Sequence, residues 1–184
     1  LCVIKKRVHN KTIQYGFVST GNFNEKTAKI YGDHLVMTSN RAIMADINKI
    51  FSALNKPRVD PTVTLKSCKT LMVCPQFMRE KIIAHIDKEI DEAKAGRKAE
   101  MIIKVNSLSD KSLIQKLYDA AQAGVTVKMI VRGIYCAINQ KEFKKKIYAI
   151  SIVDEYLEHA RVMYFYNKGA ENMYISSADW MTRN

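Results

Sequence analysis

His159-Ala-Arg-Val-Met-Tyr-Phe-Tyr-Asn-Lys-Gly-Ala-Glu-Asn-Met-Tyr-Ile-Ser-Ser-Ala-Asp-Trp-Met-Thr-Arg-Asn184 is the stretch from which the fold can be worked out. Two β-prone runs, residues 161–166 and 172–175, flank the turn-forming residues 167–169, and this pattern predicts a β-hairpin. The hairpin should return the polar residues 176–179 towards His159.

The side chains expected around His159 are suited to handling phosphate. An imidazole can attack phosphorus or donate a proton, Arg161 can bind phosphate oxygens, and Asp179 can orient a ring nitrogen. Ser177 adds a hydroxyl group. A structural histidine at the start of a strand, beside a polar turn, is the alternative, and these residues alone do not separate the two.

The same pattern occurs a second time, near the other end of the sequence. Leu1-Cys-Val-Ile-Lys5 aligns with Val162-Met-Tyr-Phe-Tyr166, and Tyr15-Gly-Phe-Val-Ser-Thr-Gly-Asn-Phe-Asn24 contains the counterpart of Met173-Tyr-Ile-Ser-Ser-Ala-Asp-Trp180. In this alignment the counterparts of His159 and Arg161 fall before residue 1. We therefore expect the first half of a two-histidine site to lie outside this sequence.

A His-x-Lys/Arg motif followed by a strand, a turn and a Ser/Thr-x-Asn/Asp element, present twice, resembles the phospholipase D superfamily. Three longer motifs narrow the resemblance to bacterial polyphosphate kinase of the type built on that fold. They are Ser19-Thr-Gly-Asn-Phe-Asn-Glu-Lys-Thr-Ala28, Ala149-Ile-Ser-Ile-Val-Asp-Glu-Tyr-Leu-Glu-His159 and Ser176-Ser-Ala-Asp-Trp-Met-Thr-Arg-Asn184. The resemblance covers essentially the whole sequence, as a piece of the C-terminal half of a much longer enzyme.

The resemblance implies an α/β fold, with a phospholipase D-like mixed sheet flanked by helices in two related domains that are both partly truncated. Residues 1–62 would be the C-terminal portion of the first domain, without its His-x-Lys motif, and residues 63–184 the N-terminal portion of the second. The family reaction is reversible transfer of the terminal phosphate of ATP to inorganic polyphosphate through a phosphohistidine. That histidine would lie outside this sequence, so we expect the isolated segment to be inactive.

The resemblance also assigns roles to single residues. His159 would be the second, assisting histidine, in contact with the nucleotide, and Tyr31 and Arg132 would also contact ATP. Five residues are candidates for binding phosphate: Asn22, Asn24, Arg161, Ser177 and Asp179. Magnesium is expected as the cofactor, although no ligands for it can be identified in this segment. Arg161 stands where the superfamily has lysine, which argues against a diesterase-like role for it.

The charge of the chain favours a polyanionic partner. The formal net charge is +12 and the isoelectric point is about 9.5. Residues 1–62 hold 10 Lys and Arg against 4 Asp and Glu, whereas residues 63–184 hold 20 against 14. Nucleic acid, inorganic polyphosphate and a merely basic soluble surface all fit this excess. The resemblance selects ATP, ADP and polyphosphate, with no specific nucleic acid.

Neither the cysteines nor the apolar runs indicate a metal centre or a membrane span. The four cysteines form no Cys-x-x-Cys pair, and the four histidines add no ligand spacing, which favours reduced cytosolic thiols. No apolar run approaches the roughly 20 residues that a membrane helix needs. For the full-length enzyme the resemblance implies a cytoplasmic homo-oligomer and leaves peripheral association with the inner membrane open.

The rest of the chain predicts alternating strands and helices. Further strands are expected at residues 1–6, 12–19, 35–38, 71–74, 101–105, 125–131 and 147–153. Helices should follow a cap at Ser39 or Asn40, run from Phe77 to Gly96, and run from Asp110 to Gly124. The prolines within residues 57–61 mark the expected domain junction.

Arg132 directly follows a strand that should be buried and parallel. Ligands gather at the carboxyl ends of strands in open α/β sheets, so Arg132 is a natural phosphate clamp. A surface ion pair is the alternative reading, and Asn106, at the end of the preceding strand, is a weaker candidate on position alone. Two other functions stay open: a phosphodiesterase or phospholipid-transferring enzyme of the same superfamily, and a non-catalytic polyanion-binding module.

Overall fold

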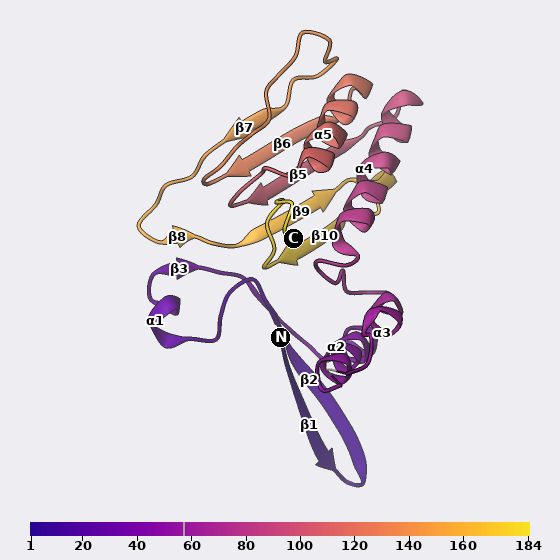
Figure 1. Cartoon of the computed structure of the whole chain (residues 1–184), viewed down its shortest axis with the longest axis vertical. Coiled ribbons are helices and arrows are strands. Elements are labelled where there is room, and N and C mark those ends of the chain that lie inside the picture. Colours follow the sequence, from indigo (N-terminus) through magenta and orange to yellow (C-terminus); the bar gives the residue numbers. More distant parts are fainter. Residues whose placement is uncertain (57) are drawn as a thin grey trace. The chain divides into compact units, whose positions relative to one another are not determined.

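The structure, a computed structural model, describes residues 1–56 and 58–184. The chain forms two compact units (Figure 1). Unit 1 comprises Leu1–Ser19 and Leu35–Met78, and unit 2 comprises Thr20–His34 and Arg79–Asn184. The segment Thr20–His34 therefore packs with the second half of the chain, although it follows the strands of unit 1 in sequence.

Unit 1 is built on a three-stranded antiparallel sheet in the order β1-β2-β4. Its strands are β1 (Cys2–Val8), β2 (Lys11–Ser19) and β4 (Leu35–Thr38), as predicted. His9 and Asn10 join β1 to β2 with positive φ angles of 44° and 60°. A two-residue turn of this kind matches the right-handed twist of the strands that it connects.

Helix α2 (Arg41–Leu54) packs on one face of this sheet. Of the two predicted caps, Asn40 is the one whose side chain is used: its Oδ1 accepts hydrogen bonds from the amides of Ala42 (2.9 Å) and Ile43 (3.2 Å). Met44 and Ile47 are buried against the sheet. The helix is therefore an element of the unit's core, as its apolar spacing predicted.

The strand predicted at residues 71–74 is wrong, because this segment is a loop. The buried carboxylate of Asp46 accepts hydrogen bonds from the amides of Thr70 (2.7 Å) and Leu71 (3.1 Å), which ties the loop to α2. Pro75 then follows and has no amide hydrogen to offer a neighbouring strand.

A short helix, α3 (Thr62–Lys66), precedes this loop and begins directly after Pro61. Pro57, the first residue of the expected domain junction, lies outside the described residues. The boundary after residue 62 stays a prediction, because the two compact units describe how segments pack and not how the domains are related.

Unit 2 contains a five-stranded mixed sheet in the order β10-β9-β5-β6-β7 (Figure 1). Its strands are β5 (Glu100–Val105), β6 (Thr126–Val131), β7 (Tyr148–Ile150), β9 (Arg161–Phe165) and β10 (Asn172–Ser176). The parallel character predicted for β6 is confirmed: β6 pairs in parallel with β5 and with β7, while β9 runs antiparallel between β5 and β10. The strand predicted at residues 147–153 is shortened to three residues.

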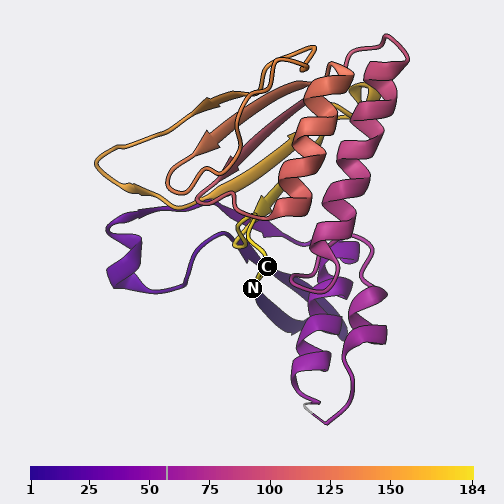
Figure 2. The same cartoon turned by 45° about the horizontal axis from the view of Figure 1, so that its top comes forward.

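Helices α4 (Met78–Lys94) and α5 (Lys111–Ala123) run side by side along one face of this sheet (Figure 2). Asp110 caps α5 by accepting from the amide of Leu113 at 3.0 Å, and Gly124 ends it with a φ of 100°. Both ends were predicted. The residues buried between the helices and the sheet are Ile82, Ile86, Met101, Ile103, Leu113, Leu117, Met129 and Phe165.

The turn of the β9–β10 hairpin is held by a buried acid on α4. Glu89 accepts hydrogen bonds from the amide of Asn167 (2.6 Å) and from the amide of Glu100 (3.1 Å). Burial raises the pKa of Glu89, and the two amide hydrogen bonds only partly oppose that rise. The turn is thereby held at the amino-terminal end of β5, and the antiparallel pairing of β9 with β5 sets the start of β9 beside the carboxyl end of β5.

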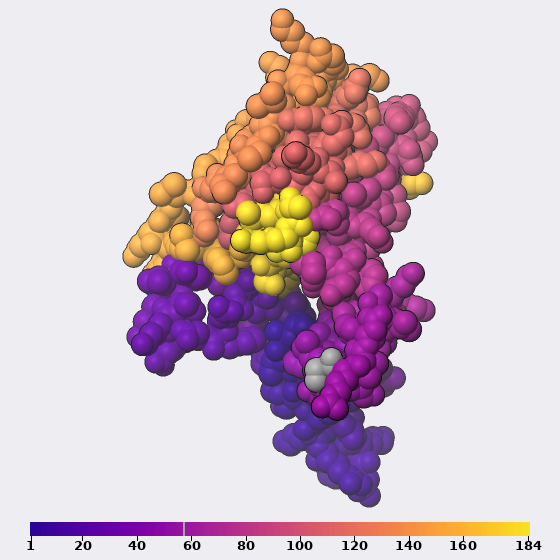
Figure 3. Space-filling view, viewed as in Figure 1, coloured from indigo at the N-terminus to yellow at the C-terminus, as the bar shows by residue number. Residues whose placement is uncertain are grey.

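The C-terminal residues lie at the surface beside the beginning of α4 (Figure 3). Arg79 donates to the carbonyls of Thr182 (3.0 Å) and Asn184 (3.2 Å) and forms an ion pair with Asp110 at 2.9 Å. This contact closes the loop that follows β10 against the helix layer.

The segment Thr20–His34 is joined to the rest of unit 2 by a short parallel pair of strands. Its elements are α1 (Glu25–Ala28) and β3 (Tyr31–Gly32), and β3 pairs with β8 (Leu157–Glu158). The carbonyl of Gly32 accepts from the amide of His159 at 3.1 Å. Residues that are more than 120 positions apart in the sequence are thus held next to one another.

Candidate functional site

The imidazole of His159 is fixed by a hydrogen bond at each ring nitrogen. Nδ1 lies 2.9 Å from Oδ1 of Asp33, and Nε2 lies 3.1 Å from Nη1 of Arg161. A guanidinium has no acceptor, so Nε2 must accept and Nδ1 must carry the proton that is donated to Asp33. We therefore assign His159 as the neutral imidazole with its proton on Nδ1.

Asp33 receives a second hydrogen bond on the same oxygen that faces the imidazole. Oγ1 of Thr20 donates to Oδ1 of Asp33 at 2.7 Å, and a Cβ atom at Gly21 would overlap the same carboxylate. Partial burial opposes ionisation of Asp33, but the hydrogen bonds from Thr20 and His159 and the charge of Arg161 outweigh it and lower the pKa of Asp33. Asp33 is therefore a carboxylate that orients the histidine ring.

Arg161 is held by a two-pronged ion pair with Asp179. Nε donates to Oδ1 at 3.1 Å and Nη2 to Oδ2 at 3.0 Å, and the side chains are only 9% and 11% exposed. Oδ1 of Asp179 also accepts from the amides of Asn106 (2.8 Å) and Ser107 (3.2 Å). Burial raises the pKa of Asp179, yet the partners more than offset this effect and lower it.

The expectation that Asp179 orients the imidazole is corrected by these contacts. Asp179 binds Arg161 and the backbone at the end of β5, because β10 pairs with β9 in a register that sets Ser176 opposite Arg161. Asp33 takes the orienting role instead. The sequence pattern could not reveal this, since Asp33 follows the other copy of the repeat.

Tyr31 and Arg132 both lie at this cluster. The ring of Tyr31 is tilted by 42° against the imidazole of His159, with the ring centroids 4.8 Å apart. Nη1 of Arg132 donates to the carbonyl of Glu158 at 3.3 Å, directly before His159. The half-buried Arg132 follows β6, so the expected rim position at the carboxyl end of a strand is confirmed.

Asn106 and Lys104 complete the surroundings of Arg161 and His159. With its amide oriented to match its neighbours, Asn106 donates to the carbonyl of Glu158 (3.0 Å) and accepts from Nη2 of Arg161 (2.8 Å). Lys104 donates to the carbonyl of Ala160 at 2.7 Å and pairs with the Glu158 carboxylate at 3.0 Å. These partners lock the backbone on both sides of His159.

We refer to Asp33, His159, Arg161 and Asp179 as the His159 cluster. In this cluster each side chain is hydrogen-bonded to the next, in the order Asp33, His159, Arg161 and Asp179, and we call this chain of contacts a relay. It ends where Asp179 accepts from the backbone amide directly after β5. Because Asp179 binds Nε and Nη2 of Arg161, Nη1 is the guanidinium nitrogen directed at the imidazole. The cluster can neutralise negative charge and can hold or move a proton at Nε2 of His159.

Comparison with known proteins identifies the family. A family model described as polyphosphate kinase C-terminal domain 2 matches residues 71–184, and the model of polyphosphate kinase C-terminal domain 1 matches residues 1–60. The chain belongs to the polyphosphate kinase family. The mixed α/β architecture expected from the resemblance is confirmed.

Curated members of the polyphosphate kinase family are similar along the whole chain. Polyphosphate kinase of Vibrio parahaemolyticus is 43% identical over 185 residues, and those of Yersinia pestis and Escherichia coli are 40% identical. Each alignment covers 100% of this chain but 26% of the relative. The chain thus spans about a quarter of the length of the curated relatives that it matches.

A solved structure is similar as well. The crystal structure of polyphosphate kinase from Porphyromonas gingivalis matches with a TM-score of 0.82 and 37% sequence identity. The match covers 97% of this chain and 29% of that one. The fold described above is therefore a fold of the polyphosphate kinase family.

Three predicted phosphate-binding residues lie outside the His159 cluster. Asn24 caps α1, with its Oδ1 accepting from the amides of Lys26 (2.9 Å) and Thr27 (3.2 Å). Asn22 and Ser177 are exposed. The roles given to these three residues stay predictions, whereas the structure brings Tyr31, Arg132, His159, Arg161 and Asp179 together.

The expected magnesium cofactor stays a prediction. Within residues 1–56 and 58–184, no three His, Cys, Asp or Glu side chains are grouped as metal ligands would be. The carboxylates nearest to His159 are already bonded, Asp33 to Thr20 and His159, and Asp179 to Arg161.

No helix in the described part of the chain is both long enough and apolar enough to span a bilayer.

Proposed function

We propose that this chain is part of a polyphosphate kinase, which reversibly transfers the terminal phosphate of ATP to inorganic polyphosphate, and that the His159 cluster is one half of its active site. The observation that carries the proposal is the fixed imidazole of His159, which is oriented by Asp33 at one nitrogen and faces Arg161 at the other. Membership of the polyphosphate kinase family supports the choice of substrates.

The reaction has two half-reactions that share one phosphohistidine. A nitrogen of a histidine outside this sequence attacks the γ-phosphorus of ATP, so that a P–N bond forms, the bond from phosphorus to the bridging oxygen breaks, and ADP leaves. A terminal oxygen of polyphosphate then attacks the same phosphorus, and the P–N bond breaks. Such transfers depend mainly on positioning and on neutralising phosphoryl charge.

His159 and Arg161 would supply that neutralisation. Nη1 of Arg161 lies against Nε2 of His159, so a phosphoryl oxygen that approaches the imidazole meets a fixed cation beside it. If Nε2 takes up a proton, the imidazolium donates to the oxygen that leaves, and Asp33 stabilises the positive ring. The pair is held before substrate arrives and needs no reorganisation during transfer.

Tyr31 and Arg132 would bind the nucleotide. The Tyr31 ring packs against His159 and offers an aromatic face on which adenine can stack. Arg132 uses Nη1 on a backbone carbonyl and keeps the remaining donors of its fork for phosphate oxygens. Both residues lie on the rim formed by β3, β6 and β8 in unit 2.

Four properties of the full-length enzyme stay predictions with this proposal. They are dependence on magnesium, a cytoplasmic location, homo-oligomerisation, and peripheral association with the inner membrane.

The full-length protein that contains this sequence provides the test. Labelled ATP, magnesium and a short polyphosphate primer should give labelled polyphosphate, and Asp33→Asn should lower its formation by about a hundredfold, because the ring loses its orienting charge. Asp154→Asn, at an exposed loop carboxylate, is the matched control and should behave as wild type. Hydrolysis of a phosphodiester such as bis(p-nitrophenyl) phosphate without polyphosphate synthesis would overturn the proposal in favour of a phosphodiesterase.

A further inference from the structure

Unit 1 carries most of the excess positive charge of the chain. Its residues include 10 Lys and Arg against 2 Asp, whereas those of unit 2 include 20 Lys and Arg against 16 Asp and Glu. Both acids of unit 1 are engaged locally: Asp46 binds Lys49 and two loop amides, and Asp60 binds the amide of Thr62. The cations of the β1–β2 hairpin are therefore not neutralised within the unit.

A cavity of about 630 Å³ lies between β2 and the first turns of α2. Two cations line it, Lys11 from β2 and Arg41 from α2, and no carboxylate does. Its polar lining consists of neutral hydroxyl and amide side chains, which are Thr12, Gln14, Ser39 and Asn48. The lining thus combines positive charge with neutral hydrogen-bonding groups, which is the composition that suits an anionic oxygen ligand.

The cavity retains hydrogen-bond donors for a ligand. Within the described residues neither Lys11 nor Arg41 forms an ion pair, and both are exposed. Nδ2 of Asn48 donates to Oε1 of Gln14 at 2.7 Å and to the carbonyl of Met44 at 2.8 Å. This arrangement turns Nε2 of Gln14, a donor group, away from Asn48.

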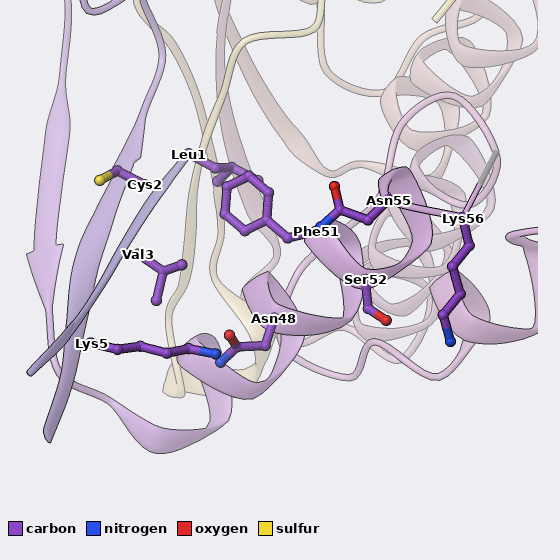
Figure 4. A pocket seen from close by; sticks show the side chains of 9 residues that line it. All are labelled: Leu1, Cys2, Val3, Lys5, Asn48, Phe51, Ser52, Asn55 and Lys56. Carbon is purple, nitrogen blue, oxygen red and sulfur yellow. The ribbon is translucent and has the colours of Figure 1, made fainter. Parts of the chain in front are cut away.

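More cations continue on the far side of Asn48. A second cavity, of about 710 Å³, shares Asn48 with the first and is lined by Lys5, whose side chain extends towards that residue (Figure 4). The pairing register sets Lys5 opposite Gln14 and Arg7 opposite Thr12, so these cations share the sheet face that α2 covers. The charges follow the hairpin and are not gathered at one point.

We propose that this cationic groove of unit 1, lined by Lys11 and Arg41 and continued by Lys5 beyond Asn48, binds a segment of inorganic polyphosphate. A single phosphate ion is best bound by donors that converge on one point, whereas a row of cations and neutral donors fits a chain with a charge on every unit. The choice of inorganic polyphosphate over other phosphate chains rests on the proposed function. All of the residues involved belong to unit 1, whereas the His159 cluster belongs to unit 2.

The 184-residue chain allows a direct test by titration with sodium tripolyphosphate and with a longer polyphosphate in a calorimeter. Lys11→Gln with Arg41→Gln should weaken binding of the longer chain by about tenfold and reduce the slope of log affinity against log salt by about 1 to 2. Lys66→Gln with Lys69→Gln removes the same charge from exposed positions of unit 1 outside both cavities. This control should lose no more than about twofold.

Equal losses in the two double variants would overturn the proposal, because binding would then follow net charge and not the groove. A single-stranded DNA of matched charge that binds as tightly and depends equally on Lys11 and Arg41 would also overturn it, in favour of nucleic acid. If the variants fail to fold, amide shifts of the wild-type chain on adding tripolyphosphate decide. Shifts centred on residues 11–14 and 39–45 support the groove, and shifts elsewhere contradict it.

This test is separate from the test of the proposed function. It measures polyphosphate binding by unit 1, whereas the proposed function is measured by polyphosphate synthesis in the full-length protein. An enzyme that synthesises polyphosphate but shows no dependence of binding on Lys11 and Arg41 would refute the groove alone.

Discussion

The two copies of the sequence repeat have similar residues but very different surroundings. After β10, Asp179 is buried against Arg161 and Trp180 is 1% exposed. After β2, the aligned residues are Asn22, which is exposed, and Phe23, which is 61% exposed. The same run of hydroxyl, small, Asn or Asp, and aromatic residues is therefore enclosed in one copy and open in the other.

The neighbouring strand explains why the motif of the second copy is enclosed. The hairpin of the second copy pairs through β9 with β5, and the backbone after β5 donates two amides to Asp179 and bonds the carbonyl of Trp180. Among the strands that the structure describes, β1 pairs with β2 alone. In the second copy the buried ion pair therefore forms where the backbone after β5 meets the hairpin.

Replacing Asp179 in the second copy and its aligned residue Asn22 in the first should give the largest difference in unfolding free energy between the copies. Asp179→Ala leaves the buried guanidinium of Arg161 and two amides without their acceptor, and should cost about 3–5 kcal/mol of unfolding free energy. Asn22→Ala, at an exposed position, should change it by less than about 0.5 kcal/mol. Urea unfolding of the 184-residue chain measures both, and equal costs would show that burial does not distinguish the two copies.

The sequence predicted the elements that are defined by local pattern. The β9–β10 hairpin, the caps Asn40 and Asp110, the stop at Gly124 and the parallel pair β5–β6 all follow from spacing and turn residues. The strand predicted at residues 71–74 failed because a distant carboxylate, Asp46, binds the loop amides just before it. Local apolar character cannot reveal a partner of that kind.

Local sequence pattern likewise predicted most residues of the candidate site but missed one. Arg132, His159, Arg161 and Asp179 stand at strand ends or within the hairpin motif, where the sequence pattern singles them out. Asp33 was missed because it reaches His159 through the pairing of β3 with β8, which joins short segments without a periodic signal. An acid two residues after Tyr31 was the one visible hint, and only the fold gives it meaning.

Kinetics of the full-length enzyme should show that Arg132 and His159 act as a unit. Arg132→Ala and His159→Ala should each lower turnover by about 10²–10³, by analogy with the loss of one preorganised donor. The double variant should cost little more than the worse single one, because both act on the same phosphate. Steady-state rates decide this, with Lys66→Ala as an exposed control, and strictly multiplicative losses would show that the two residues do not share a site.

Exchanging the small residues of the two copies should give a smaller but asymmetric effect. Gly21→Ala places a Cβ atom onto the Asp33 carboxylate and should destabilise the chain by about 1–3 kcal/mol. Ala178→Gly, the aligned change in the second copy, adds only backbone freedom and should cost about 0.5–1 kcal/mol. Unfolding midpoints of the two variants can be compared directly, and a harmless Gly21→Ala would mean that Asp33 is not held at the distance described here.

The smallest predicted effect concerns Asp33, which follows the first copy in sequence but serves the second. Hydrogen bonds from Thr20 and His159 outweigh partial burial and lower its pKa below the ordinary value of 3.8. Between the pKa of Asp33 in the folded chain and its pKa in the unfolded chain, the unfolded chain binds more protons than the folded chain. The stabilisation by Asp33 is therefore complete above the pKa of the unfolded chain and is lost as the pH falls through the pKa of the folded chain. Asp33→Asn should remove about 0.5–1 kcal/mol at pH 6 and almost none at pH 2.5, because the pair is partly open to solvent. Urea unfolding of both chains across this range measures the difference, with Asp154→Asn as the control.

A difference that persists unchanged at pH 2.5 would mean that Asp33 contributes through its shape and not through its charge, and the relay from Asp33 to Asp179 would then begin at His159.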